Sequence, residues 1–324
     1  MRIASFNLEN LGEDDGPAAV ARHDVLRPQL ERIDADILCL QEIDAARGKG
    51  DDKRRTLGAL EELLAGTAYA GFHRTTTLRS STGEPRDRHN LVILSRWPIE
   101  KAEQFSNDLV EPALYEPTTA EPRAGPRPIT WERPIQHAVI ALGTNARLHV
   151  VNLHLKAPLA SFIPGQKIGP FAWKSVAGWA EGYFVAAMKR AGQALEARIL
   201  IDKIFDSDPA AMIAICGDFN AQQKDVAFEI LAGDTEDTGN GALTVRELIP
   251  LENSIPESQR FTVIHGGRRM MLDHILVSRA LLGHYRGVEI HNEALGDELI
   301  AYTTIAGTPE SYHAPVVATF SLGA

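Results

Sequence analysis

The sequence contains little cysteine, no excess of positive charge and no long hydrophobic run. Its two cysteines, Cys39 and Cys216, each lie inside an apolar segment, which favours buried thiols over a disulfide or a metal-binding pair. The formal net charge of -10 argues against binding nucleic acid through bulk charge, although a local basic cleft remains compatible with it. The first residues, MRIASFNLENL, lack the apolar core of a secretory signal or membrane span. We therefore expect a cytoplasmic protein with no membrane partner and no obligate protein partner.

The sequence does contain enough apolar residues for a large core. Of its 324 residues, 44% are hydrophobic, and no change in composition divides the chain, so we expect a single domain over residues 1–324. Seven short segments predict strands: RIASFNL, ADILCLQE, NLVILS, RLHVVNLHL, AMIAICGDF, LDHILVS and HAPVVATF. Helix-like segments lie at 18–33, 54–65, 184–206 and 225–232. Strands and helices mix without the regular alternation of a doubly wound sheet.

Two segments depart from this pattern and predict loop excursions. Residues 107–134 are rich in proline and charge, which indicates a path over the surface. Residues 156–183 combine lysines with aromatic residues. They could form a hydrophobic lid packed on the body, or one wall of a substrate cleft in which rings stack on a base or a lipid chain and lysines meet phosphate. The sequence favours these two interpretations about equally.

Polar residues interrupt several predicted strands at or near their ends. In VVNLHL, alternation places Asn152, His154 and Lys156 on the face opposite the apolar residues, so one face suits a core and the other a site. We take Asn152 and Lys156 as candidate substrate-binding residues. Asp218 and Asn220 follow the apolar strand AMIAIC in the same way. Such strand ends commonly carry chemistry.

Two further positions, Asn7 in IASFNL and Glu42 in ADILCLQE, extend this set. Each residue alone has an ordinary structural explanation, such as a turn, a helix cap or a solvated strand end. Together they supply the hard oxygen ligands that suit Mg²⁺ or Mn²⁺, with histidines but no thiolate pair, which fits phosphate chemistry better than a zinc site. The sequence has no phosphate-binding G-x-x-x-x-G-K-[ST] loop and no G-x-S-x-G elbow, so covalent serine catalysis is unsupported.

The motifs FNLENL, LQE, NLVILS, VNLHL, GDFNA, LDHILVS and SYHAPV, in this order, resemble the endonuclease/exonuclease/phosphatase superfamily, which includes pancreatic deoxyribonuclease and the apurinic endonucleases. The motifs extend over residues 6–320. The resemblance implies an α+β four-layer sandwich, in which two mixed β-sheets pack face to face with helices on the outside. It also implies metal-dependent cleavage of phosphate esters at the edge of the sheets.

The resemblance further implies a role for each polar residue near the strand ends. Glu42 would be the principal metal carboxylate, assisted by Asn7. Asp218 would orient or deprotonate the attacking water, and Asn220 would hold a phosphate oxygen. In-line attack on phosphorus needs such a placed water and neutralised oxygens, and it requires no covalent intermediate.

Two histidines and one aspartate complete the implied site. His154 matches the strand histidine that family nucleases use on the leaving-group side, and His313 matches the histidine that contacts the phosphate. Asp273 would hydrogen-bond His313 and fix its tautomer.

Tyr312 departs from the family pattern, in which an aspartate that helps to bind metal usually precedes the final histidine. A neutral phenol is a poor Mg²⁺ ligand. The enzyme could work with Glu42 and Asn7 alone, or Glu310 could supply the missing charge if a strand begins there, or the chain could bind phosphate without catalysis. Because the other site residues are retained, we favour an active enzyme.

The substrate is less constrained than the chemistry. We expect a metal-dependent phosphodiesterase and favour a nuclease; the alternatives are an enzyme for a small or lipid phosphoester and a non-catalytic phosphate-binding module. The W-x-G-D-x-N-x-R pattern of the inositol phosphatases is absent. Basic residues in 47–55, with Arg123, Arg127 and Arg133, could contact a nucleic-acid backbone or could be solvated loop charges.

Overall fold

The chain forms two large β-sheets, three two-stranded ribbons and five α-helices within the residues that the structure describes. A computed structural model describes residues 1–12, 16–48, 54–123, 125–143, 146–299 and 309–322. The strands of the first large sheet are β1 (Arg2–Leu11), β2 (Ile37–Ile43), β5 (His73–Thr76), β6 (Asn90–Ser95), β17 (Tyr285–Ile290) and β18 (Val316–Phe320). Those of the second are β7 (Ile99–Phe105), β10 (Ile135–Ala141), β11 (Arg147–His154), β12 (Met212–Asp218), β13 (Ile249–Pro250) and β16 (Asp273–Val277).

The ribbons and helices surround these sheets. The ribbons pair β3 (Ala46–Arg47) with β4 (Arg55–Thr56), β8 (Leu114–Tyr115) with β9 (Arg127–Pro128), and β14 (Val263–His265) with β15 (Arg268–Met270). The helices are α1 (Gly16–Ile33), α2 (Gly58–Leu64), α3 (Val176–Ser207), α4 (Val226–Ala232) and α5 (Arg279–Leu282). None of the described helices is long and apolar enough to span a bilayer.

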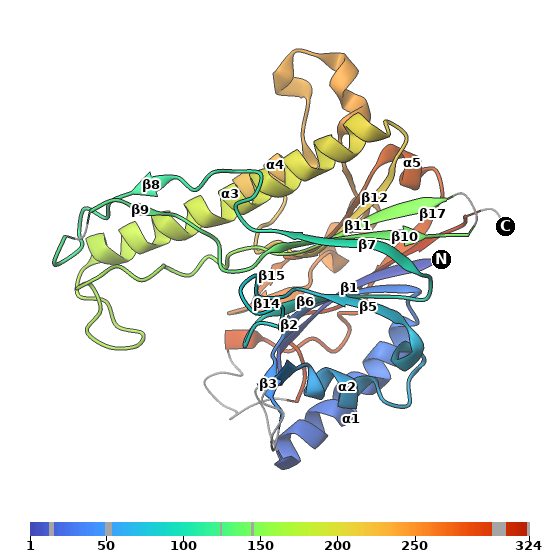
Figure 1. Cartoon of the computed structure of the whole chain (residues 1–324), viewed down its shortest axis with the longest axis horizontal. Helices are drawn as coiled ribbons and strands as arrows, with labels where there is room; N and C mark the ends of the chain where they lie inside the picture. The colour runs from blue at the N-terminus through green and yellow to red at the C-terminus, as the bar shows by residue number, and fades with distance from the viewer. Residues whose placement is uncertain (13–15, 49–53, 124, 144–145, 300–308, 323–324) are drawn as a thin grey trace.

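Both large sheets are mixed, and each contains one parallel pair at its centre. The strand order is β17-β18-β1-β2-β6-β5 in the first sheet and β13-β16-β12-β11-β10-β7 in the second. Strands β1 and β2 run parallel, as do β11 and β12, while their other neighbours are antiparallel. The two sheets lie face to face (Figure 1). Parallel neighbours end at the same edge, so each sheet delivers two strand ends to one place.

Helices cover the outer face of each sheet. Phe6 of β1 and Leu26 of α1 belong to one buried cluster, and Val151 of β11 and Ile201 of α3 belong to another. Helices α1 and α2 therefore form the layer on one side, and α3 and α4 form the layer on the other (Figure 1). This arrangement confirms the predicted α+β four-layer sandwich.

A third apolar cluster fills the space between the sheets and contains both cysteines. Cys39 and Cys216 are fully buried free thiols, as the sequence predicts. Polar residues lie in the same interior. Asn152 is fully buried, accepts a hydrogen bond from Gln41 at 2.8 Å, and donates to Gln136 and to two backbone carbonyls. Its predicted role in substrate binding is wrong, because every polar atom of its side chain is occupied in a core network.

Two carboxylates of α3 fasten the proline-rich excursion to the body. Glu196 is completely buried and accepts hydrogen bonds from the indole of Trp131 and from the backbone N–H groups of residues 107–109. Glu181 accepts bonds from the Tyr115 hydroxyl and from Thr119. The described residues of 107–134 therefore follow a path that is fixed by contacts with α3.

The second excursion is shorter than predicted because α3 begins at Val176 instead of near residue 184. The first half of α3 extends beyond the sheets, with β8, β9 and the chain before the helix lying beside it (Figure 1). We call the described residues of 107–134 and 156–189 the arm. The arm has its own small apolar cluster of Ala120, Ile163 and Val185, so it packs internally.

Candidate active site

The four central strand ends bring the predicted polar residues together. Asn7, near the end of β1, donates from Nδ2 to Glu42 Oε1 of β2 at 3.3 Å and to Asp218 Oδ2 of β12 at 3.2 Å. His154 ends β11, and its Nε2 lies 3.4 Å from both of those carboxylates. The site thus joins the two sheets at the edge where both parallel pairs end.

Unusual backbone conformations gather at this edge. Glu9, Asn10, Glu42, His89 and Asn220 all have positive φ, between 47° and 59°. Left-handed backbone is uncommon for residues with a side chain, and such conformations concentrate at functional sites. The irregularity in β1 between Asn7 and Leu11 also directs the Asn10 N–H to Glu42 Oε2 at 3.1 Å, which fixes the orientation of that carboxylate.

Strand register explains why Asp218 has a glycine before it. Gly217 has a φ of +143°, and a Cβ placed there would lie 2.0 Å from the carbonyl oxygen of Leu153 on β11. Only glycine permits this approach between the parallel strands. The same register sets His154 opposite Asp218, and Asp218 opposite Asp273 on β16.

Asp273 and His313 form the ion pair that the resemblance implies. Asp273 Oδ2 lies 2.8 Å from His313 Nδ1. Burial alone would lower the pKa of His313, but Asp273 and the further carboxylates of Asp218 and Glu9 raise it well above the usual value. The histidine, whose side chain is 15% exposed, is therefore a partly buried cation at neutral pH, and the charge of a second acid, Asp218, acts on it.

Asp218 is buried, and its pKa lies well above the usual value. Burial and the charge of Asp273 raise its pKa to about 7, against the opposing effect of His313. Its oxygens accept hydrogen bonds from the backbone and side-chain amides of Asn220 at 2.8 and 3.0 Å. A carboxyl group poised near neutrality and held in one orientation suits a general base.

His154 differs in charge from His313. Burial, followed by the charge of Arg133, lowers its pKa well below the usual value, so the ring is neutral at pH 7. Its Nδ1 is buried and has no hydrogen-bond partner among the described residues. The 3.4 Å separations from Glu42 and Asp218 exceed ordinary hydrogen-bond distances, so these carboxylates keep free acceptor capacity.

Three residues at the site were not recognised as site residues from the sequence. Glu9 follows Asn7 by two positions, and its charge acts on His313. His89 precedes β6 and lies 3.7 Å from Glu42. Arg133, which we took only as a possible backbone contact, donates to the Leu155 carbonyl, and its charge acts on Glu42. The alternation in FNLEN could have revealed Glu9.

Tyr312 and Glu310 do not form the expected alternative metal position. Strand β18 begins at Val316, so the premise that Glu310 lies on a strand is wrong, and Glu310 is exposed. Tyr312 is 7% exposed, and its ring lies against Gly296. Its backbone N–H donates to Glu9 Oε2 at 2.9 Å, so the Glu9 carboxylate lies beside the position at which the family motif has an aspartate.

The donor set fits a divalent cation. Ligand atoms of Glu42, His89 and His154 lie within 4.8 Å of one another, and a second such group contains Asp218, Asp273 and His313. In the group at Glu42, one carboxylate, the hard oxygen donor that Mg²⁺ and Mn²⁺ prefer, is accompanied by two imidazoles. Among the described residues, Glu42, His89 and His154 have ligand atoms close enough to share one ion, and the Asn7 amide lies beside Glu42.

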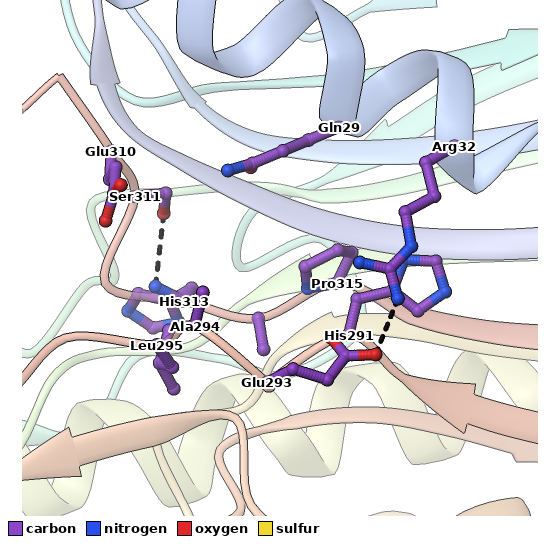
Figure 2. A pocket seen from close by; sticks show the side chains of 11 residues that line it. Gln29, Arg32, His291, Glu293, Ala294, Leu295, Glu310, Ser311, His313 and Pro315 are labelled. Atoms are coloured by element: carbon purple, nitrogen blue, oxygen red, sulfur yellow. Dashed lines mark hydrogen bonds and ion pairs between the residues drawn. The ribbon is translucent and has the colours of Figure 1, made fainter.

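Pockets adjoin the site on several sides. One, of about 120 Å³, has His313 at one end and the Arg32–Glu293 ion pair at the other (Figure 2). Another, of about 540 Å³, is lined by Asn220 and Arg190. Lys156, a predicted substrate-binding residue, lies in the arm with its Nζ 3.7 Å from a carboxylate oxygen of Glu132. Residues 49–53 of the basic segment 47–55 lie outside the described part of the chain.

Comparisons with known proteins agree with this geometry. The sequence profile of the Endonuclease/Exonuclease/phosphatase family matches residues 4–311. No curated protein sequence matches the chain.

Solved structures match nearly the whole chain at low identity. Truncated Caenorhabditis elegans TDP2 is 14% identical, with a TM-score of 0.56 over 98% of this chain and 96% of its own. The 3′ phosphatase NExo from Neisseria, bound to product DNA hairpin, is 17% identical, with a TM-score of 0.52 over 99% and 100%. A family protein from Leptotrichia buccalis is 12% identical, with a TM-score of 0.57 over 99% and 100%. At these identities the matches show the shared fold.

Proposed function

Because the chain belongs to the endonuclease/exonuclease/phosphatase family, it is a divalent-metal-dependent phosphoester hydrolase, and we propose that its substrate is a phosphodiester bond of nucleic acid. The observation that carries the proposal is the meeting of Asn7, Glu42, His154 and Asp218 at one edge, beside the Asp273–His313 pair. These residues supply a base, a partly buried cation and oxygen ligands within one small site.

We propose that Glu42, Asn7 and Glu9 hold Mg²⁺, with Mn²⁺ as the alternative ion. Bound there, the ion would supply charge neutralisation at the phosphate and the leaving oxygen. Glu9 would supply the carboxylate that is missing at position 312, because the Tyr312 N–H holds the Glu9 side chain in place. Glu9 thus takes the role that the sequence offered to Glu310 as one of three possibilities.

We propose a separate role in the reaction for each of the other site residues. Asp218, in its ionised form, orients the attacking water and accepts its proton. Protonated His313, charged because Asp273 pairs with it, stabilises the negative phosphate oxygens, and Asn220 holds one of them. His154 is neutral and would act near the leaving group through a hydrogen bond, not as an imidazolium ion.

Local positive charge supports a nucleic-acid substrate despite the acidic balance of the chain. Arg133 lies at the centre of the site, Arg190 lines the pocket beside Asn220, and Lys156 lies in the arm. The described NExo structure contains a DNA hairpin, which favours the same substrate class for this chain. Because that protein is called a 3′ phosphatase, terminal phosphate removal is the second candidate activity. The cytoplasmic location remains a prediction.

A turnover panel tests the proposal. Single-stranded DNA, duplex DNA, abasic DNA, RNA and a phosphomonoester are incubated with Mg²⁺ or Mn²⁺, with Asp218→Asn and His313→Ala as active-site controls. We expect cleavage of at least one nucleic acid and a loss of roughly 100-fold or more in each variant. Turnover of the phosphomonoester alone would establish the second candidate instead. Near-normal rates in both variants would show that the site is misplaced.

A further inference from the structure

A pocket of about 400 Å³ lies inside the arm, between its two loop segments and α3. Ile163 and Val185 of the arm's apolar cluster line it, together with the ring of Phe162, which is 69% exposed. An exposed aromatic ring above an apolar wall is a surface on which a flat group can stack.

The walls of this pocket are fixed by the contacts that organise the arm. The Glu121 N–H donates to the Pro164 carbonyl at 2.9 Å, and Gln166 Nε2 donates to the Thr119 carbonyl at 2.6 Å. Gly165 approaches so closely that a Cβ there would lie 2.2 Å from the Glu121 carbonyl oxygen. The two loop segments thus form one preformed surface, which reduces the conformational entropy lost on binding a ligand.

Uncompensated positive charge lies at the pocket. Lys156 and Lys189 both line it, and both pair with the single carboxylate of Glu132, at 3.7 and 2.5 Å. Two ammonium groups facing one carboxylate leave one positive charge. The Lys156 and Lys189 side chains are 20% and 17% exposed, so each is partly withdrawn from water and still reachable. A partly desolvated ammonium group pairs strongly with an incoming phosphate.

The pocket and the candidate active site are built from neighbouring residues of the same segments. Lys156 follows His154 by two residues, and Glu132 directly precedes Arg133. Gln193 of α3 binds the two segments together, since its Nε2 donates to the carbonyls of both Arg133 and His154 at 2.9 and 3.2 Å. The wall of the pocket is therefore fastened to the strand and the segment that carry His154 and Arg133.

We propose that this pocket binds a nucleotide next to the scissile phosphate, with its base against Phe162 and its own phosphate between Lys156 and Lys189. The inference rests on the proposed function and names the subsite that gives it specificity. The pocket volume is at the lower end of the range of roughly 300–1,000 Å³ for small-molecule sites, which suits one nucleotide better than the paired acyl chains of a lipid.

Two pairs of matched variants test the subsite without touching the catalytic residues. Phe162→Ala is compared with Phe171→Ala, a ring that is 97% exposed on the same segment and does not line the pocket. Lys189→Gln is compared with Lys174→Gln, whose lysine pairs with Glu121 outside the pocket. The probe is a fluorescently labelled single-stranded tetrathymidylate, and binding is measured by anisotropy in chelator at low salt, so that no cleavage occurs.

We expect Phe162→Ala and Lys189→Gln each to raise the Kd by about tenfold, and each control by less than twofold. A probe of the same length without bases should bind Phe162→Ala and the parent equally. Equal losses in test and control variants, or no loss in any, would overturn the subsite. The subsite would also be overturned if the parent did not bind the oligonucleotide, but bound short-chain phospholipid micelles more tightly than Phe162→Ala does.

Turnover separates the subsite from the function on which it rests. Bis(4-nitrophenyl) phosphate has no neighbouring nucleotide, so its hydrolysis with Mg²⁺ should be the same in all five proteins. Selective loss of oligonucleotide binding in a protein that cleaves no nucleic acid would support the subsite and contradict the nuclease assignment. Cleavage of nucleic acid, together with unchanged oligonucleotide binding in both pocket variants, would support the nuclease assignment and contradict the subsite.

Discussion

Tyr312 is the residue at which the chain departs most clearly from the motif that it otherwise resembles. The phenol ring is buried against Gly296, while the backbone of the same residue holds Glu9 by a 2.9 Å hydrogen bond. A missing aspartate at one position is thus accompanied by a glutamate placed beside it from β1. If Glu9 supplies the negative charge, the enzyme does not need a carboxylate at residue 312.

This compensation predicts an ordered series of metal affinities. Glu9→Gln should weaken Mg²⁺ binding by about tenfold, because one anionic ligand is lost, and adding Tyr312→Asp to it should restore much of the loss. Glu310→Gln is the matched control and should bind Mg²⁺ like the parent, since Glu310 is exposed and outside the strand. Calorimetric titration of the four proteins measures this. A large loss in Glu310→Gln with none in Glu9→Gln would contradict the assignment.

Asp218 predicts a pH dependence of stability in the metal-free protein. Its folded-state pKa of about 7 lies above its ordinary value of 3.8, so the group stabilises the fold at low pH, and that contribution is lost as the pH rises through about 7. Relative to Asp218→Asn, the parent should lose about 2 kcal/mol of unfolding free energy between about pH 5 and pH 8. Denaturant unfolding in chelator measures this difference. An unfolding free energy of the parent that rises relative to that of the variant as the pH rises would disprove the prediction.

At the scale of elements, sequence patterns located the strands better than the ends of the helices. Period-two alternation identified β1 and β11, and a continuous apolar run identified β12, which is buried on both faces. The first two turns of α3 were assigned to the excursion that combines lysines with aromatic residues, and they contain Gly178 and Gly182. Those glycines are needed for packing: a Cβ at either would lie 2.4 Å from Gln166 Oε1 or the Ser161 carbonyl. Propensity could not reveal this tertiary requirement.

The site shows the same division between local pattern and tertiary context. His154, Asp218, Asp273 and His313 stand in or beside recognisable strands, and their proximity follows from the implied fold. His89 could not be placed, because nothing in the sequence shows that the start of β6 lies beside the end of β2. That pairing is antiparallel and long-range, and it is decided by the packing of the whole sheet.

Glu196 offers a test of the arm as an element. Glu196→Ala removes the acceptor for three backbone N–H groups and for the Trp131 indole, so buried donors lose their partners. We expect a loss of about 3 kcal/mol of stability and faster proteolysis within residues 107–134. Glu116→Ala, an exposed position in the same segment, should leave both unchanged. Equal proteolysis of the two variants would show that α3 does not anchor the arm.

For the whole molecule, net charge and local charge point in opposite directions. The chain carries a formal charge of -10, yet Arg133, Lys156 and Lys189 lie at or beside the site. Nucleic acid should therefore be bound through a few local phosphate contacts and repelled elsewhere. Binding of a single-stranded oligonucleotide in chelator should weaken by about tenfold between 50 and 200 mM salt. Affinity that is independent of salt would contradict a site built on these charges.

The central claim is that the edge where β1, β2, β11 and β12 end is a metal-dependent hydrolytic site. The most direct measurement is the rate of oligonucleotide cleavage as Mg²⁺ is titrated, for the parent and for Glu42→Gln, whose amide keeps the shape of the side chain without its charge. The parent should be active only with metal, and the variant should be inactive while melting like the parent in chelator. Full turnover by the parent in excess chelator, or parent-like metal dependence in Glu42→Gln, would contradict the claim.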